Sequence, residues 1–474
     1  MSHSLVVAIV LLLAIVAFEG RRRWTHKPIG LLSVAHLVFV LNYCIPPLFI
    51  ALIGGTSLET DPYGVRLFLF SVVEQVQLGA GAFATGSWLA LLAYCAMIAG
   101  YMLIKVKVGS RMVALDSAGV PLRGLGLAGV ALGVVTVAAL LLYSPQFKSF
   151  LHMVSTDPNR AWYASDPTGL LMMFKMGVLV RGGEVSISRG FLQIIVLLGV
   201  PAVMFLSASA ARAQGPVRWA LAVGMGLVWL AVLARVYHAS GRMEFAAFIV
   251  LFPLAALLSL RSIKVAMIGL VPVLLFGLFI GVADNAFFST PGASAGLMGE
   301  ALFFKSGQSI LFMLNEFSFP YVISAHTAHV VPELVAYRHF IDLPLAALYM
   351  LPSIGGADTW PPMISHIHLE MLPYMPIDLV SFGYYSWGAV GVALVFLVFG
   401  SALAVFDLWL VPGAGWLAQC LRAGWMMYLP LRIMYADPYT SMKTGFGLIV
   451  GTVIVVALVW LTQRRNRARW ELPS

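Results

Sequence analysis

One segment, residues 284–383, holds five of the ten histidines of this chain together with several acidic residues. Within it, Arg338 and His339 are adjacent and Asp342 follows three residues later. A histidine beside an arginine and a carboxylate can move a proton close to an anionic leaving group. The alternative is a structural histidine whose ring is fully hydrogen-bonded in the folded protein. The segment is therefore the first place to look for chemistry.

Two histidine pairs in the same segment resemble metal-ligand spacings. His326 and His329 form an H-x-x-H pair, with Glu333 nearby, and His366 and His368 form an H-x-H pair. A zinc site needs three or four convergent ligands, so either pair alone is weak evidence. We therefore expect neither a metal nor another cofactor.

Arginines before this segment suggest an anionic ligand. Arg181 and Arg189 flank Gly182 and Gly183 within residues 143–190. A guanidinium can grip a phosphate with two hydrogen bonds, and glycines let backbone N–H groups approach. The alternative is that these arginines only reach toward lipid headgroups.

A second basic cluster follows at residues 233–245. Arg235, His238 and Arg242 have the i, i+3, i+7 spacing of one helical face. Ionisable groups at membrane level are costly, so they suggest function by default. The alternative is an ion pair with Glu244 that only fixes a helical hairpin.

Composition defines the elements that must position these residues. The chain is 61% hydrophobic and only 10% charged, which is typical of a polytopic membrane protein and of no soluble protein of this size. We predict an all-α protein, a single membrane domain over 1–474 with about eleven spans of bilayer-crossing length. The predicted spans are 4–19, 30–53, 83–104, 124–143, 190–208, 217–236, 244–260, 265–283, 384–408, 414–434 and 445–463.

Charge predicts the orientation of these spans. If successive spans alternate in direction, 16 of the 29 Lys and Arg residues fall on one face of the membrane with only four acidic residues. Loops rich in Lys and Arg stay in the cytoplasm. The N-terminus is therefore expected outside and the C-terminus inside. The Lys and Arg clusters lie beside apolar spans, where they determine topology, so they argue against nucleic-acid binding.

The orientation predicts two large extracytoplasmic loops, 144–189 and 284–383. They contain apolar stretches too short or too interrupted to span, at 170–180, 310–323 and 343–354. Such stretches suit re-entrant or interfacial helices folded back onto the bundle. The second loop ends in Asp378 and a run of aromatic and glycine residues.

Four segments, in this order, resemble the O-antigen (Wzy-type) family of oligosaccharide repeat-unit polymerases. They are SGRMEFAAFIV (240–250), LNEFSFPYVISAHTAHVVPE (314–333), LPLAALYMLPS (343–353) and PIDLVSFGYYSWGAVGV (376–392). The resemblance covers roughly residues 180–400 as an ordered pattern. Asp378 matches the family's acidic residue before an N-F-G-like element, with Ser381 where asparagine is usual.

The resemblance implies a metal-independent glycosyltransferase of the bacterial inner membrane. Such enzymes transfer a growing glycan from its polyprenyl diphosphate to a sugar hydroxyl on the next lipid-linked unit, at the periplasmic face. Membrane lipids and a chain-length regulator are further expected partners. The implied diphosphate-binding residues are Arg181, Arg189, Arg235, Arg242 and Arg338. The implied general bases are His339, Asp378 and His238, and the implied sugar-binding aromatics are Tyr384 and Tyr385, with Trp162 and Trp360 as further candidates.

Three other functions remain open at this point. O-antigen ligases would use the same arginines and are poorly separated from polymerases by sequence. A membrane-bound O-acyltransferase would place its key histidine nearer the cytoplasm, where the predicted loops hold only His26. A transporter or flippase would distribute charges along its inner spans, ideally in internal repeats. This chain concentrates its charges outside the spans, which favours an enzyme.

Overall fold

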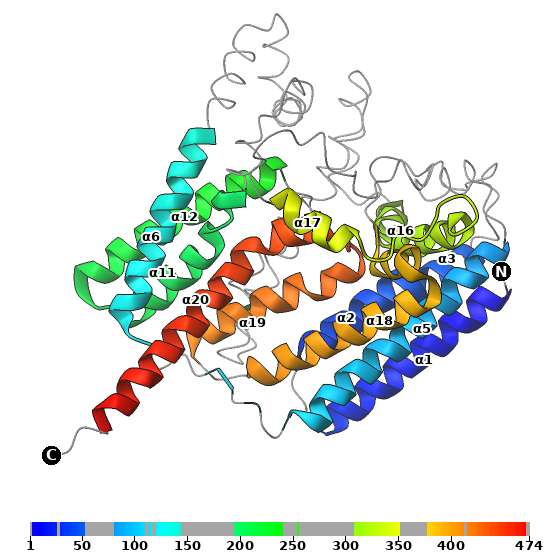
Figure 1. The fold of residues 1–474 in the computed structure, drawn as a ribbon, viewed down its shortest axis with the longest axis horizontal. Coiled ribbons are helices and arrows are strands. Elements are labelled where there is room, and N and C mark those ends of the chain that lie inside the picture. Colours follow the sequence, from blue (N-terminus) through cyan, green and yellow to red (C-terminus); the bar gives the residue numbers. More distant parts are fainter. Residues whose placement is uncertain are drawn as a thin grey trace, which may run out of the picture.

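The computed structural model describes residues 2–25, 29–52, 80–109, 112, 114–115, 120–143, 194–239, 254–255, 308–350, 377–411 and 415–470. Every regular element in these ranges is helical, as predicted (Figure 1). The α-helices are α1 (Ser2–Trp24), α2 (Leu31–Phe39), α3 (Ile45–Leu52), α5 (Ala80–Lys107), α6 (Leu122–Tyr143), α11 (Gly199–Arg212), α12 (Gly215–Ala239), α16 (Gln308–Val330), α17 (Asp342–Met350), α18 (Leu379–Trp409), α19 (Trp416–Tyr428) and α20 (Pro438–Trp470). A π-helical turn, η1 (Val40–Cys44), joins α2 to α3, and a 3-10 turn, η4 (Pro430–Ile433), follows α19.

Eight helices in the described ranges are long and apolar enough to cross a membrane. They are His3–Trp24, Leu31–Leu48, Ala80–Lys107, Arg123–Leu141, Ile194–Arg212, Gly215–Val232, Leu379–Trp409 and Pro438–Thr462. Each overlaps a predicted span, so the multi-pass helical class is confirmed. The predicted spans 244–260 and 265–283 lie outside the described residues, apart from 254–255. The total of about eleven spans and their orientation stay predictions.

The predicted span at 414–434 differs from the structure. Its helix, α19, has 13 residues, whereas a bilayer crossing needs about 20. Pro430 has no backbone N–H and begins the 3-10 turn η4 instead of continuing the helix. Nearly the whole of α19 is buried, so it is an internal helix packed among longer ones.

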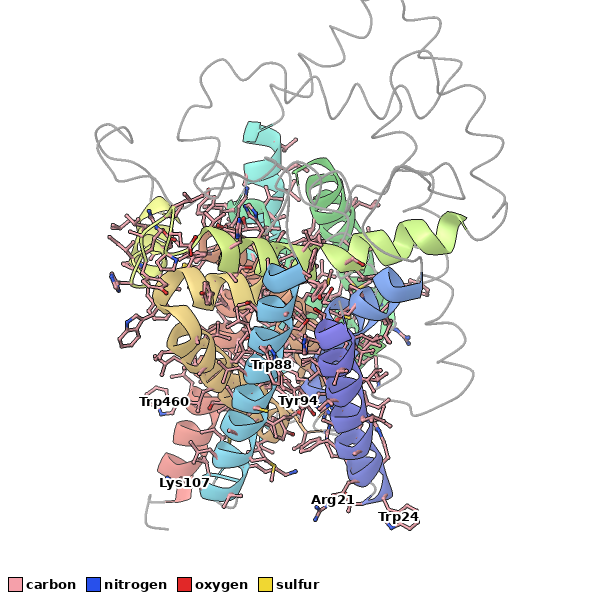
Figure 2. The ribbon with its side chains drawn as sticks, turned by 90° about the vertical axis from the view of Figure 1, so that its right-hand side faces the viewer. Arg21, Trp24, Trp88, Tyr94, Lys107 and Trp460 are labelled. Carbon is pink, nitrogen blue, oxygen red and sulfur yellow. The ribbon has the colours of Figure 1, made fainter. Side chains whose placement is uncertain are left out.

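Basic residues gather at one end of the bundle. Arg21 ends α1 and Lys107 ends α5, and Figure 2 shows both at the same end of the molecule. We call this the basic end and the opposite one the distal end. For these two helices the structure agrees with the alternating arrangement from which the charge asymmetry was counted.

A very close helix contact joins α5 to α18. A Cβ at Gly400 would overlap the carbonyl oxygen of Met97, and one at Gly100 would overlap that of Leu397. Small residues are what allow two membrane helices to approach this closely. Buried side chains around the contact, including Phe396 and Leu403 (both 0% exposed), make it the centre of the hydrophobic core.

Two helices of the predicted large loop lie at the distal end. Figure 2 shows α16 running across the bundle, nearly perpendicular to α1 and α5. The Tyr321 hydroxyl of α16 is 3.1 Å from the Ser87 hydroxyl of α5, and a Cβ at Gly86 would lie 3.1 Å from the Ala325 nitrogen. The stretch 310–323 falls within α16, and 343–354 begins within α17. Helices folded back onto the bundle were expected for both stretches.

The glycine contact can be tested by comparing two glycine-to-alanine variants. Gly400→Ala should destabilise the protein by about 1–3 kcal/mol, because the added methyl group forces α5 and α18 apart. Gly224→Ala, in α12, meets no atom within 4 Å and should be neutral or stabilising by up to about 1 kcal/mol. The measurement is the thermal unfolding midpoint of the detergent-solubilised protein. Equal midpoints for the two variants would contradict the packing.

Candidate functional site

The candidate site forms where the 337–341 loop meets a break in α18. The backbone N–H of Arg338 donates to the Tyr385 carbonyl at 3.0 Å, and that of His339 donates to the Ser386 carbonyl at 2.9 Å. These two carbonyls would normally accept from the next turn of their own helix. The helix is interrupted at Trp387 and Gly388, so the loop supplies the donors instead.

Gly388 makes this break possible. Its φ of 59° and ψ of −151° belong to a region that is essentially open to glycine alone. A Cβ there would also lie 3.1 Å from the Tyr337 hydroxyl oxygen. The run of aromatic and glycine residues that follows Asp378 in the sequence therefore sets the place where the loop docks.

Five of the predicted site residues belong to this unit. Arg338 and His339 are on the loop, Tyr384 and Tyr385 lie on the helical turn before the break, and Asp378 begins the same helix. His339 is exposed and Tyr384 is half-buried, whereas Tyr385 is buried. His339 has a positive φ of 49°, a strained value for a residue with a side chain.

Arg338 is held in place by an ion pair. Its Nη2 lies 2.7 Å and its Nε 3.2 Å from Oδ1 of Asp342. Asp342 is fully buried at the start of α17, while the Arg338 side chain keeps 21% of its surface exposed. The pair orients the guanidinium, and it also neutralises part of its charge.

Asp378 caps the first turn of α18. Its Oδ2 accepts hydrogen bonds from the Val380 N–H at 3.0 Å, the Ser381 N–H at 3.3 Å and the Tyr43 hydroxyl. Its Oδ1 accepts one from the Ser381 hydroxyl. Serine at 381, the departure from the family pattern, thus supplies two of the donors. This carboxylate is fully buried and occupied by donors, so the geometry assigns it a capping role; proton transfer at Asp378 stays a prediction.

The remaining predicted site residues lie elsewhere. Arg181, Arg189 and Arg242 are outside the described residues. Arg235 and His238 fall in the last two turns of α12, which Figure 1 shows ending on the same side of the molecule as α17. Their side chains are outside the described part, so their convergence with Arg338 stays a prediction.

The predicted histidine pairs are only partly described. His326 is completely buried in α16 and His329 is exposed, while His366 and His368 lie outside the described residues. In the part of the chain that the structure covers, no group of three His, Cys, Asp or Glu side chains could hold a metal ion.

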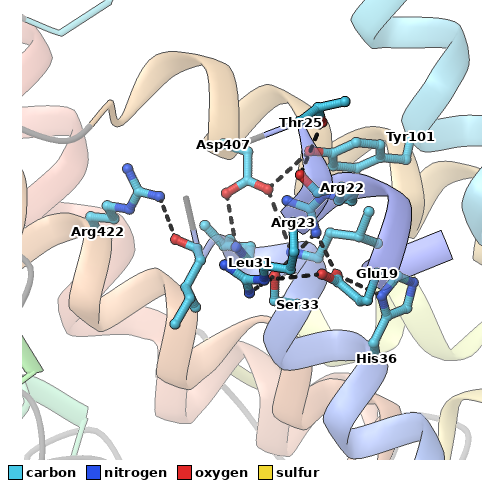
Figure 3. A network of polar contacts seen from close by, with 12 residues as sticks. Glu19, Arg22, Arg23, Thr25, Leu31, Ser33, His36, Tyr101, Asp407 and Arg422 are labelled. Carbon is cyan, nitrogen blue, oxygen red and sulfur yellow. Dashed lines mark hydrogen bonds and ion pairs between the residues drawn. The ribbon is translucent and has the colours of Figure 1, made fainter. Parts of the chain in front are cut away.

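A second polar cluster lies at the basic end (Figure 3). Asp407 of α18 accepts a hydrogen bond from the Leu31 N–H at 2.8 Å and one from the Tyr101 hydroxyl at 3.1 Å. Glu19 of α1 pairs with Arg22 and contacts Nδ1 of His36 at 2.9 Å. These contacts tie the start of α2 to the ends of α1 and α18. We interpret the cluster as structural, since its charges are matched.

Arg422 belongs to the same region. It is buried in α19. Its Nη1 donates to the Leu410 carbonyl at 2.8 Å and its Nη2 to the Ile29 carbonyl at 2.9 Å. Both acceptors are in chain segments that flank helices at the basic end.

Comparison with family models, with curated proteins and with solved structures found no match to this chain. The polymerase resemblance therefore rests on the four sequence segments and stays a prediction.

Asp378 should make stability depend on pH. Burial raises the pKa of Asp378 to about 6, against the opposing hydrogen bonds from Ser381 and Tyr43. Because the folded state holds this proton more tightly than the unfolded state, stability should fall as the pH rises from about 4 through 6. Asp378→Asn should flatten this part of the profile. The measurement is the thermal unfolding midpoint of the parent protein and of Asp378→Asn from pH 4 to 7. If the two midpoints change with pH in parallel, Asp378 is not the cause of the pH dependence.

The structural role of Asp407 is tested by substitution. Asp407→Leu leaves the Leu31 N–H and the Tyr101 hydroxyl without their acceptor and should cost about 1–3 kcal/mol of stability. Tyr101→Phe removes only one donor and should cost less. The thermal unfolding midpoints of the two variants show which substitution costs more stability. An Asp407→Leu protein more stable than the parent would contradict the structural role of Asp407.

Proposed function

We propose that this protein joins oligosaccharide repeat units carried on polyprenyl diphosphate, acting as a metal-independent glycosyltransferase at its distal end. The observation that supports this most is the docking of the 337–341 loop against the break in α18. It gathers a cation, an exposed histidine and aromatic rings at the end opposite the basic residues. An enzyme that acts on a lipid-linked anionic sugar needs these three kinds of group.

In the proposed reaction, a hydroxyl oxygen of the acceptor sugar attacks the anomeric carbon of the donor sugar. The bond from that carbon to the diphosphate oxygen breaks, and the electron pair leaves with the diphosphate. His339 accepts the hydroxyl proton as the general base, a role open to its exposed imidazole. Arg338, oriented by Asp342, stabilises the charge on the departing diphosphate.

Aromatic side chains near the break would bind the sugars. Tyr384 is half-buried and Trp387 is 51% exposed, so both present ring surface at the site. Tyr385 is buried and packs edge-on against Phe382 at 5.6 Å, which suits support of the site better than contact with sugar. Asp378 would act by positioning the start of α18, with His238 as the further candidate base.

The remaining parts of the proposal follow from the same reaction. The apolar helices would hold the prenyl tail in a bacterial inner membrane, with the distal end on the periplasmic side and a chain-length regulator as a partner. Arg181, Arg189, Arg235 and Arg242 would meet the second diphosphate. Ligation of finished glycan to a lipid core is the competing reaction with the same leaving group.

The test is deletion of the gene, with complementation by variants and analysis of surface glycans. The parent chain should restore the polymer ladder and His339→Asn should not, because asparagine tolerates the positive φ but cannot act as the base. Glu333→Gln changes an exposed residue on the same segment and should restore the ladder, which makes it the matched control.

Two results would reject the polymerase function. An unchanged ladder in the deletion strain would exclude any required role in polymerisation. Loss of every unit, single-unit caps included, would point to a ligase or flippase. A normal ladder from the His339→Asn variant, with the deletion phenotype intact, would reject the site and leave the function standing.

A further inference from the structure

Arg432 is a buried arginine that pairs with no carboxylate in the part of the chain that the structure describes. It lies in η4 and is 8% exposed. Its Nε is 3.3 Å from the Tyr428 carbonyl, and its Nη1 is 3.4 Å from the Ser441 hydroxyl and 3.3 Å from the Thr444 hydroxyl. The guanidinium also stacks over the Tyr428 ring, 4.7 Å from its centroid. These contacts are long, and all involve neutral groups.

Other buried or half-buried arginines of the described chain are better matched. Arg22 pairs with Glu19 and Arg338 with Asp342. Arg422 has two short carbonyl contacts and interacts electrostatically with Asp407. Arg432 forms no ion pair with any carboxylate in the described ranges. A buried charge is costly unless a counter-charge accompanies it, so this position favours the binding of an anion.

The arginine lies toward the distal end, close to the candidate site. Three residues after η4, the Ala436 N–H donates to the Ile377 carbonyl at 2.7 Å, directly before the cap residue Asp378. The Tyr435 ring packs on Phe319 of α16, with centroids 5.5 Å apart. Ser441 and Thr444 are in the first two turns of α20, the helix on which α17 packs.

The side chains around Arg432 suit a phosphate. A guanidinium offers five N–H donors in a planar fork that fits phosphate oxygens. The Ser441 and Thr444 hydroxyls accept from Arg432, and each donates a long hydrogen bond to a carbonyl, that of Tyr435 at 3.2 Å and that of Ser441 at 3.4 Å. Each hydroxyl can rotate to exchange this weak bond for one to an added anion. A phosphate has enough oxygens to accept from all three groups together.

We propose that Arg432, Ser441 and Thr444 form a phosphate-binding site at the distal end. The inference rests on the proposed function, which supplies the ligand: the diphosphate of one of the two lipid-linked substrates. Arg338, already paired with Asp342, would then face the other diphosphate. Arg338 and Arg432 would thus bind the diphosphates of two different substrates, the donor and the acceptor. The headgroup of an anionic phospholipid, whose phosphate no positive group on the same headgroup neutralises, is the other source of such a phosphate.

The site can be tested without turnover. The full-length protein in phosphatidylcholine nanodiscs is titrated with inorganic pyrophosphate, and binding is followed by calorimetry. Arg432→Met, which replaces the guanidinium with an unbranched, uncharged side chain, should weaken binding about tenfold or more, as the loss of a charge-assisted contact does. Arg432→Lys should retain part of the affinity. Lys443→Met removes an equal charge from α20, the helix that carries Ser441 and Thr444, and should change binding by less than about twofold.

Thr444→Val provides a second test if Arg432→Met lowers the unfolding midpoint. It keeps the shape of the residue, removes one hydroxyl, and should weaken pyrophosphate binding about threefold or more by the loss of one hydrogen bond. Unchanged affinity in both the Arg432 and Thr444 variants would overturn the site. Equal weakening by Lys443→Met would also overturn it, since net charge alone would then explain binding.

Two further arms identify the ligand. In nanodiscs that contain phosphatidylglycerol, a lipid headgroup occupying the site would abolish pyrophosphate binding, and that result would overturn the diphosphate assignment. Retained binding in these discs supports it. If the deletion strain keeps its polymer ladder while Arg432→Met still loses pyrophosphate binding, the proposed function fails and the phosphate site stands.

Discussion

The close contact between α5 and α18 is the constraint on which the rest of the structure depends. Gly100 and Gly400 bring the two backbones together, which leaves little freedom for α18 to shift along its neighbour. At the distal end the same pair of helices supports α16, which rests on α5 through Gly86. The depth of α18 in turn sets the position of its cap and of its break, where the candidate site forms.

A second constraint acts on every polar group inside the bundle. Apolar surroundings offer no hydrogen bonds, so polar side chains must find partners within the protein. At the basic end Glu19, Asp407 and Arg422 each have short contacts with partners. At the distal end Asp378 has several donors, and Arg432 has only long contacts with neutral groups. The exposed His339 and the contacts of Arg432 are the features from which we propose a ligand site at this end.

Parts of the site could be predicted from the sequence. Arg338, His339 and Asp342 are neighbours along the chain, so their proximity needs only a turn. The docking of Arg338 and His339 onto Tyr385 and Ser386 could not be predicted, because no local pattern shows which carbonyls a broken helix leaves free. The role of Asp378 was open for a similar reason. Its partner Tyr43 is 335 residues away, and a lone tyrosine in an apolar run carries no signal of such a contact.

The sequence by itself determined the class of the protein, the approximate place of most of its long helices, and the end at which α1 and α5 carry their basic residues. These properties follow from local hydropathy and charge, which act residue by residue and need no knowledge of neighbours in space. Tertiary structure alone decided that residues 414–434 form a short internal helix and a 3-10 turn, and which charges are matched. Which partner a charged side chain meets depends on how closely the helices pack and on where along the helix axes the side chain lies. For that reason Arg338 pairs with Asp342, whereas Arg432 pairs with no carboxylate among the described residues.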